Sequence, residues 1–378
     1  MDEINFNHDT NNDINEIKFT SLSFNDEEIF ADQNHENLAS KISINQLLAE
    51  TRKEAKPNKC YYCGQKIIGF CNSHSVPAFL LRNIASKGKV YCANNFVKIP
   101  IFNTQGGINN TGTFHLLCDK CDSLIFREYE NPNNYEKVPT SIMLSQIAMK
   151  NYLKNIAKRR FENVLYEKFK KINPYLNDYC DDHIQGAKLD LEEYSKDYRR
   201  ARAANIKKSN SFKLIFYKKL NHVIPFAFQN GIALLYDFKG NIINNIYCKT
   251  LHYHLKEIHV CALPFKDFSI VMMFVDVNLK KYNNFYRQLS TLPQDTQLAI
   301  VNYIIFLYSE DFYMSPSISK KILENKEFKR VVGQLTTAVS DSPIQTPAII
   351  AAKSTFDLNN WGSIPNLLDK AYEITQTK

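Results

Sequence analysis

Glycine is scarce in this sequence, with 11 residues among 378, and tryptophan occurs once. So few glycines exclude collagen-like and low-complexity chains. No stretch approaches the roughly 20 consecutive apolar residues of a membrane-spanning helix. The best apolar runs, Phe268 to Val277 and Leu298 to Tyr308, have the length of core elements. The start, Met-Asp-Glu-Ile-Asn, lacks the basic and apolar regions of a secretory signal. We therefore expect a cytoplasmic globular protein without a membrane segment.

Hydrophobic residues are plentiful, at 44% of the chain, and 25 Phe and 21 Tyr are among them. This content is enough for a sizeable core and suits two or three domains. Nine cysteines occur without any sign of secretion. In a reducing compartment, closely spaced cysteines favour metal binding over disulfides.

The net charge of +8 is unevenly distributed. Residues 1–50 contain eleven acidic residues and two lysines, so the totals of 47 basic and 39 acidic residues leave 45 and 28 after position 50. The resulting +17 indicates a polyanionic partner, with nucleic acid as the first candidate. Residues 1–42 show no periodic apolar pattern, which predicts a disordered acidic leader. This leader either solubilises the protein or shields the basic surface.

Two Cys-x2-Cys pairs are the strongest chemical signal in the chain. Two thiolates separated by two residues can hold one ion in a tight knuckle, and two such pairs complete a tetrahedral zinc site. Gly64 follows the first pair, and the second pair precedes an expected helix, which is a treble-clef order. We predict one structural Zn2+ bound by Cys60, Cys63, Cys118 and Cys121. A local alternative would use Cys60, Cys63, Cys71 and His74.

The predicted fold class is α+β, in four segments. The leader (1–42) precedes a zinc-binding module (43–139) whose short elements need a metal to hold them together. A basic helical segment (140–210) and a mixed α+β domain (211–378) follow. Periodicity predicts helices over 142–172, 189–208, 281–289, 294–308 and 365–375, and strands over 212–217, 231–237, 242–248, 258–263 and 268–277.

The zinc-binding module also carries a family resemblance. Ser73-His74-Ser-Val-Pro77 stands between the cysteine pairs, and Leu116-Leu-Cys118-Asp-Lys-Cys121-Asp122 contains the second pair. Over about residues 60–130 the chain resembles the HNH, or His-Me finger, endonucleases with a four-cysteine zinc knuckle. The resemblance implies a ββα-metal finger that hydrolyses phosphodiester bonds of DNA or RNA with Mg2+ or Mn2+. The same motifs also resemble uncharacterised bacterial proteins, from which no activity follows.

The resemblance assigns roles to individual residues. It implies that His74 is the general base and that Asp122 binds the catalytic ion. Ser73 stands where an acidic ligand is usual, and Thr113 stands where the family has an orienting Asn, so two functional positions are weakened. Arg82 or Arg127 would contact the phosphate. For Glu128 and Glu130, a solvated helix face is the simpler explanation than assistance at the ion.

A stripe of cations is expected on the helix that follows the module. Lys150, Lys154 and Lys158 recur every four residues and therefore share one face, which Arg159 and Arg160 extend. Such a stripe could follow a phosphate backbone without reading sequence. A solvated helix face has the same pattern.

The C-terminal domain offers few chemical clues. His252 and His254 would share one face of a strand, and we interpret them and His259 as surface residues. We expect this domain to recognise a protein partner or to hold a homo-oligomer together.

Two functional hypotheses result. The first is an HNH-like metal-dependent nuclease, which by analogy would suit a phage-defence or toxin-type effector. The alternative is a catalytically inactive zinc module that binds nucleic acid or a protein. His74, Pro77 and Asp122 favour the nuclease, whereas Ser73 favours the alternative.

Overall fold

The structure is a computed structural model that describes residues 46–67, 69–92, 105–109, 111–248, 250, 253–309, 311–332, 334–335 and 352–375. The expected acidic leader (1–42) and His252 lie outside these residues. In the described part of the chain, no helix combines the length and apolar character needed to cross a bilayer.

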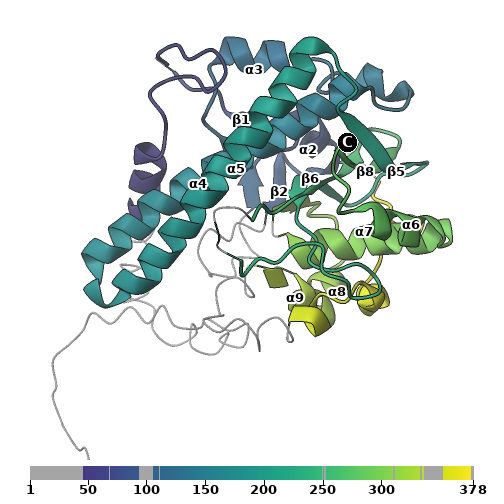
Figure 1. Cartoon of the computed structure of the whole chain (residues 1–378). Helices are drawn as coiled ribbons and strands as arrows, with labels where there is room; N and C mark the ends of the chain where they lie inside the picture. The colour runs from purple at the N-terminus through teal and green to yellow at the C-terminus, as the bar shows by residue number, and fades with distance from the viewer. Residues whose placement is uncertain are drawn as a thin grey trace, which may run out of the picture.

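The fold mixes helices and strands, as the sequence predicts (Figure 1). A cluster of four cysteines lies in its N-terminal part. A helix over residues 46–54 comes first. The strands are β1 (Ser73–His74), β2 (Lys89–Cys92), β3 (Gln105–Gly107), β4 (Thr113–Phe114), β5 (Phe212–Leu220), β6 (Phe226–Ile232), β7 (Ile258–Pro264), β8 (Ser269–Asp276) and β9 (Phe312–Met314). The helices are α2 (Ala78–Ile84), α3 (Asp119–Ile125), α4 (Ser141–Ile172), α5 (Asn177–Lys207), α6 (Asn283–Ser290), α7 (Gln294–Tyr308), α8 (Lys320–Leu323) and α9 (Lys326–Val331). Short 3-10 helices include η2 (Pro132–Glu136), η3 (Pro174–Leu176), η4 (Leu358–Ser363) and η5 (Lys370–Tyr372).

Seven strands form one sheet in the order β3-β2-β9-β6-β7-β8-β5. The pairs are antiparallel, and the consecutive strands β7 and β8 form a hairpin. Strands β2 and β3 come from the predicted zinc-binding module, and β2 pairs with β9, more than 200 residues later. The module is therefore joined to the C-terminal part of the chain through a shared sheet.

The sheet separates two hydrophobic cores, and alternation along β7 shows how. Ile258, Val260 and Ala262 pack with α7 on one face, whereas Cys261 and Leu263 pack with α4 on the other. Every residue of β7 is buried, as expected for a central strand covered on both faces. The second core also contains many residues of the cysteine-containing module. The short elements of this module are therefore held together by a core that they share with α4 and the sheet, and not by a metal site alone.

Helices α4 and α5 lie side by side as a long antiparallel pair across this second core (Figure 1). Thr140 caps α4 by accepting a hydrogen bond from the Met143 amide. The first half of α4 is buried on all sides, and this part includes Gln146, Lys150 and Asn151. Buried polar side chains need hydrogen-bond or ion-pair partners, and the partners of Lys150 are described below.

Several sequence-based boundaries agree with the structure and others do not. The helices predicted over 142–172 and 294–308 match α4 and α7. Helix α5 begins at Asn177, twelve residues before the predicted start. No strand forms over 242–248, because Asn244 bonds to the backbone of Leu234 and Lys256 instead of a strand partner. The last predicted helix is limited to η5.

Candidate metal centre and basic surface

The first cysteine pair sits in a tight knuckle. The Cys60 amide donates to the Gln65 carbonyl at 2.8 Å, and the Gly64 amide donates to the Cys60 carbonyl at the same distance. Gly64 has a φ of 72°, in the left-handed region that glycine adopts without a steric penalty. Lys59 and Lys66 close the knuckle through an isolated β-bridge. This backbone geometry places the thiols of Cys60 and Cys63 on the same side.

The second pair lies at the start of α3, where Cys118 is the N-cap residue. The Tyr61 amide donates to the Leu116 carbonyl at 2.9 Å, which holds the knuckle beside the helix start. As a result the thiol sulfurs of Cys60, Cys63, Cys118 and Cys121 lie within 4.8 Å of one another. Zn–S bonds of about 2.3 Å place the sulfurs of a tetrahedral site about 3.8 Å apart. The four predicted ligands therefore form a cluster that could hold a metal ion such as zinc.

The charge environment of the cluster favours a cation. Burial opposes ionisation of Cys60, but amide donors from Cys63, Cys118 and Tyr62 lower the pKa of its thiol to about 7. Burial and the neighbouring thiols raise the pKa of Cys121. A thiolate at one position thus disfavours a second, and a divalent ion removes this conflict because it binds thiolates directly.

The alternative site with Cys71 and His74 does not form among the described residues. The Cys71 thiol is 3.5 Å from the Asp122 carboxylate, and burial followed by the charge of Asp122 raises its pKa to about 12. The His74 ring contacts the Ile108 carbonyl through Nε2 at 2.9 Å. Both side chains are used elsewhere, so the four-cysteine set is the one that the fold assembles.

Asp122 lies in a buried ion pair instead of an open cleft. Its Oδ1 accepts hydrogen bonds from the Ser73 hydroxyl at 2.8 Å and from the Lys150 ammonium at 2.9 Å. The same ammonium is 3.2 Å from Glu130 and 3.8 Å from the centroid of the Phe126 ring. Burial alone would raise the pKa of Asp122, but Lys150 and Ser73 lower it below its ordinary value. The positive charge beside Asp122 is therefore supplied by the protein itself.

His74 does not share this environment. Ser73 and His74 are successive residues of β1, so their side chains point to opposite faces, and only Ser73 faces Asp122. Thr113 lies opposite His74 in the β1–β4 register. The expected pair of His74 and Asp122 is thus not brought together on one face of the hairpin.

The prediction of an exposed cationic stripe on α4 is wrong for Lys150 and Lys154, because the side chains of these two residues point inward. Lys150 has an exposed fraction of 0%. Lys154 is also largely buried and lies 2.8 Å from Asp311. Periodicity shows that charges share a helix face, but it does not show which side of the molecule that face meets.

The remaining residues of the stripe also have partners. Arg159 pairs with Glu162 and, at 2.7 Å, with Asp190. Arg160 donates to the Ala55 carbonyl at 3.0 Å, and Lys158 also has an interaction partner. The charged side chains of this stripe therefore contact other parts of the fold.

The two arginines expected near the phosphate lie on the surface. Arg82 is exposed in the last turn of α2. Arg127 is exposed and lies 3.4 Å from Glu128, whose backbone carbonyl accepts a hydrogen bond from Asn134. Neither arginine is tied to Asp122 by a contact among the described residues.

A different set of cations has no carboxylate partner in the described part of the chain. The knuckle packs against α5, since Tyr61 contacts Tyr198 and the Arg202 guanidinium lies 4.5 Å from the centroid of the Tyr62 ring. Exposed cations occur in both elements: Lys59 and Lys66 in the knuckle, Arg199 and Lys207 on α5, and Lys208 at the C-cap of that helix. We call these five residues, together with Arg202, the knuckle–α5 surface. The sequence shows the α5 cluster, but not its contact with the knuckle.

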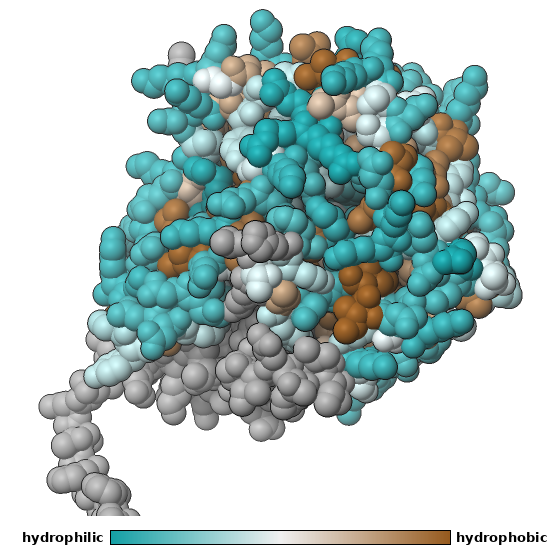
Figure 2. All heavy atoms as spheres, viewed as in Figure 1, coloured by the Kyte–Doolittle hydropathy of each residue, from teal (hydrophilic) through white to brown (hydrophobic). Residues whose placement is uncertain are grey.

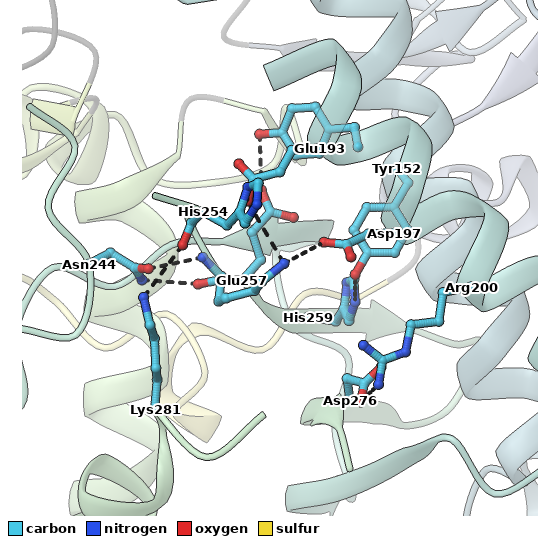
Figure 3. Close-up of polar contacts among 12 residues, drawn as sticks. Tyr152, Glu193, Asp197, Arg200, Asn244, His254, Glu257, His259, Asp276 and Lys281 are labelled. Atoms are coloured by element: carbon cyan, nitrogen blue, oxygen red, sulfur yellow. Dashed lines mark hydrogen bonds and ion pairs between the residues drawn. The ribbon is translucent and has the colours of Figure 1, made fainter. Parts of the chain in front are cut away.

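The histidines of the C-terminal part occupy two different settings (Figure 3). His254 lies 3.2 Å from Glu193 on α5 and is partly exposed. His259 is buried against Tyr152, and burial lowers its pKa to about 3. The expectation of a surface histidine is therefore wrong for His259, which is a neutral core residue.

Comparison of the chain with protein-family models, with curated proteins and with solved structures gives no match.

Proposed function

We propose that this protein binds nucleic acid through the knuckle–α5 surface, and that a structural zinc ion in the four-cysteine cluster holds that surface in shape. The observation that carries the proposal is the contrast between two sets of cations. Those on α4 are paired inside the fold, whereas Lys59, Lys66, Arg199 and Lys207 are exposed and lack a carboxylate partner among the described residues.

Unpaired cations of this kind fit a phosphate backbone. An exposed ammonium gains little from a single surface carboxylate, but several cations together displace the counterions condensed on a nucleic acid. The +17 carried by residues 51–378 acts in the same direction, because it attracts a polyanion from a distance. The face in Figure 2 is mostly hydrophilic, and its hydrophobic residues occur in small separate groups. This supports a charged partner more than an apolar protein interface on that face.

Zinc is the metal that suits four thiolates, since structural zinc sites are tetrahedral and use such ligands. The order of the knuckle and the helix start supports our inference of a treble-clef finger. In this proposal the ion does no chemistry. It fixes the knuckle against α5, so that cations from both elements stay on one surface.

Hydrolysis of the HNH type is not part of the proposal. Such a reaction needs a base and a hard cation at the same phosphate. Asp122, the candidate ligand, is satisfied by Lys150 and Ser73, and His74 projects from the opposite face of β1. The geometry therefore favours a module that binds nucleic acid without cutting it.

Charge removal tests the proposal. The variant Lys59→Gln, Lys66→Gln, Arg199→Gln, Lys207→Gln should bind a fluorescent 20-nucleotide RNA more weakly, in an anisotropy titration at several salt concentrations. Each lost phosphate contact reduces the salt slope by about 0.7 on a single strand, so four contacts predict a reduction of up to about 3.

A matched control carries the same change of net charge. Lys239→Gln, Lys280→Gln, Lys320→Gln, Lys321→Gln removes four exposed lysines from other parts of the fold. If both variants lose affinity equally, binding follows net charge alone and the assigned surface is incorrect.

A further inference from the structure

A pocket opens between the cysteine-containing module and the edge of the sheet. It has a volume of about 340 Å3, and its walls come from α2, η2, the end of β5 and the turn between β7 and β8. Three aromatic rings and two lysines contribute to its lining: Phe79, Phe265, Phe268, Lys219 and Lys266. This volume lies at the lower end of the range of small-ligand sites, which combine aromatic walls with a few polar groups.

The aromatic rings form one connected group. Phe265 and Phe268 are stacked, with centroids 4.6 Å apart and an interplanar angle of 9°. Phe79 lies 5.9 Å from Phe265 in a tilted arrangement. Phe265 is buried, whereas Phe268 and Phe79 are partly exposed. The pocket therefore presents aromatic surface that a planar ring can contact.

Lys219 connects this aromatic surface with charge. Its ammonium lies 4.0 Å from the centroid of the Phe268 ring, on a side chain that is exposed to solvent. Lys266 lines the same pocket. The site thus combines a flat aromatic wall with positive charge at its rim, while Glu136 adds a hydrogen-bond acceptor of the kind that nucleobase amino groups need.

We propose that this pocket binds one unpaired nucleotide of the nucleic acid, with the base against Phe268 and the phosphate at Lys219. The inference rests on the proposed function, which it extends from backbone contacts to recognition of single-stranded character. A duplex keeps its bases stacked and cannot place one in the pocket, so the pocket distinguishes single strands from duplexes.

We expect a nucleobase to replace the Lys219 ammonium on the Phe268 ring, because the base makes the stronger contact. A base stacked on an aromatic side chain is held more strongly than an ammonium in an exposed cation–π contact. Lys219 has a long unbranched side chain, so its ammonium can leave the ring and meet the phosphate of the incoming nucleotide. The Phe268 ring then contacts the base, and the Lys219 ammonium contacts the phosphate.

The test compares a 12-nucleotide RNA with the duplex of the same sequence. Phe268→Leu should weaken binding of the single strand roughly 5- to 150-fold, the loss of one stacked base, and leave duplex binding unchanged. Phe268→Tyr keeps the ring and should bind like the wild type. Tyr286→Leu, which removes an exposed aromatic residue on α6, serves as the matched control.

The outcomes separate this inference from the proposed function. Unchanged single-strand affinity in Phe268→Leu, or an equal loss on both RNAs, would overturn the pocket assignment while leaving backbone binding intact. If the wild type binds neither RNA, the proposed function fails, and the pocket is then tested alone by saturation-transfer NMR with AMP. A signal that Phe268→Leu removes supports the pocket, and absence of a signal in the wild type overturns it.

Discussion

Replacing Lys150 with methionine tests whether the buried ion pair holds the cysteine-containing module to α4. Methionine keeps most of the volume of the lysine side chain, so the change removes charge with little loss of packing. Asp122 would then stay largely buried and charged, with only the Ser73 hydroxyl as a polar partner close to Oδ1. Removing one member of a buried ion pair typically costs about 3–5 kcal/mol.

The expected loss of stability is large enough for a thermal melt. In a chain of this size, 1 kcal/mol corresponds to about 2 °C in Tm, so Lys150→Met should melt roughly 6–10 °C below the wild type. Circular dichroism or dye-based fluorimetry measures this directly. The double variant Lys150→Met, Asp122→Asn should recover part of the loss, because it removes the unpaired charge.

The pH dependence provides a second readout of the same pair. Lys150 keeps the pKa of Asp122 below its ordinary value, so the pair stabilises the fold at neutral pH and this contribution is lost as pH falls through the folded pKa. The gap in Tm between wild type and Lys150→Met should therefore shrink in acid. The control is Lys168→Met, also on α4, which breaks a surface pair with Glu54 of the first helix and should change Tm little. If Lys150→Met melts within about 2 °C of the wild type or no lower than Lys168→Met, the reasoning about this pair is refuted.

Three further predictions concern the metal and a buried acid. Cys118→Ser should lose its zinc, measured by elemental analysis, and should have a lower Tm. Cys248→Ser, outside the cluster, should keep the zinc content and the Tm of the wild type. Zinc retained by Cys118→Ser would contradict the four-cysteine assignment. Chelation should lower the stability of the whole fold, because the module shares its core with α4 and the sheet. Burial raises the pKa of Glu257 to about 8, so wild-type stability should decline as pH rises from about 4 to about 8, where this carboxyl loses its proton in the fold. Glu257→Gln should flatten that decline in melts at pH 5 and pH 8.5, and an unchanged pH profile would argue against a neutral buried Glu257.

The sequence predicts local features of this protein better than long-range ones. Cys-x2-Cys spacing indicates the four clustered thiols, because each pair is held by local backbone: a knuckle for Cys60 and Cys63, and a helix start for Cys118 and Cys121. The limits of α4 follow from Thr140 at its start and Asn173 at its end, both local signals.

Side-chain partners far apart in the sequence were not predictable in the same way. The inward direction of Lys150 and Lys154 depends on Asp122 and Asp311, which are brought near α4 only by the complete fold. Pairing of β2 with β9 has no signal in either segment, because both strands are short. The resemblance to HNH endonucleases stays a prediction, and it could not show that an ammonium accompanies Asp122.

The most direct test of the central claim is a combined binding and cleavage experiment on the wild-type protein. Labelled RNA and DNA are titrated with the protein at several salt concentrations in the presence of Mg2+ or Mn2+, and the same samples are then separated on a denaturing gel. The account predicts affinity that falls steeply with salt, with every strand recovered at full length. Absence of salt-dependent binding, or cleavage that His74→Ala abolishes, would contradict it.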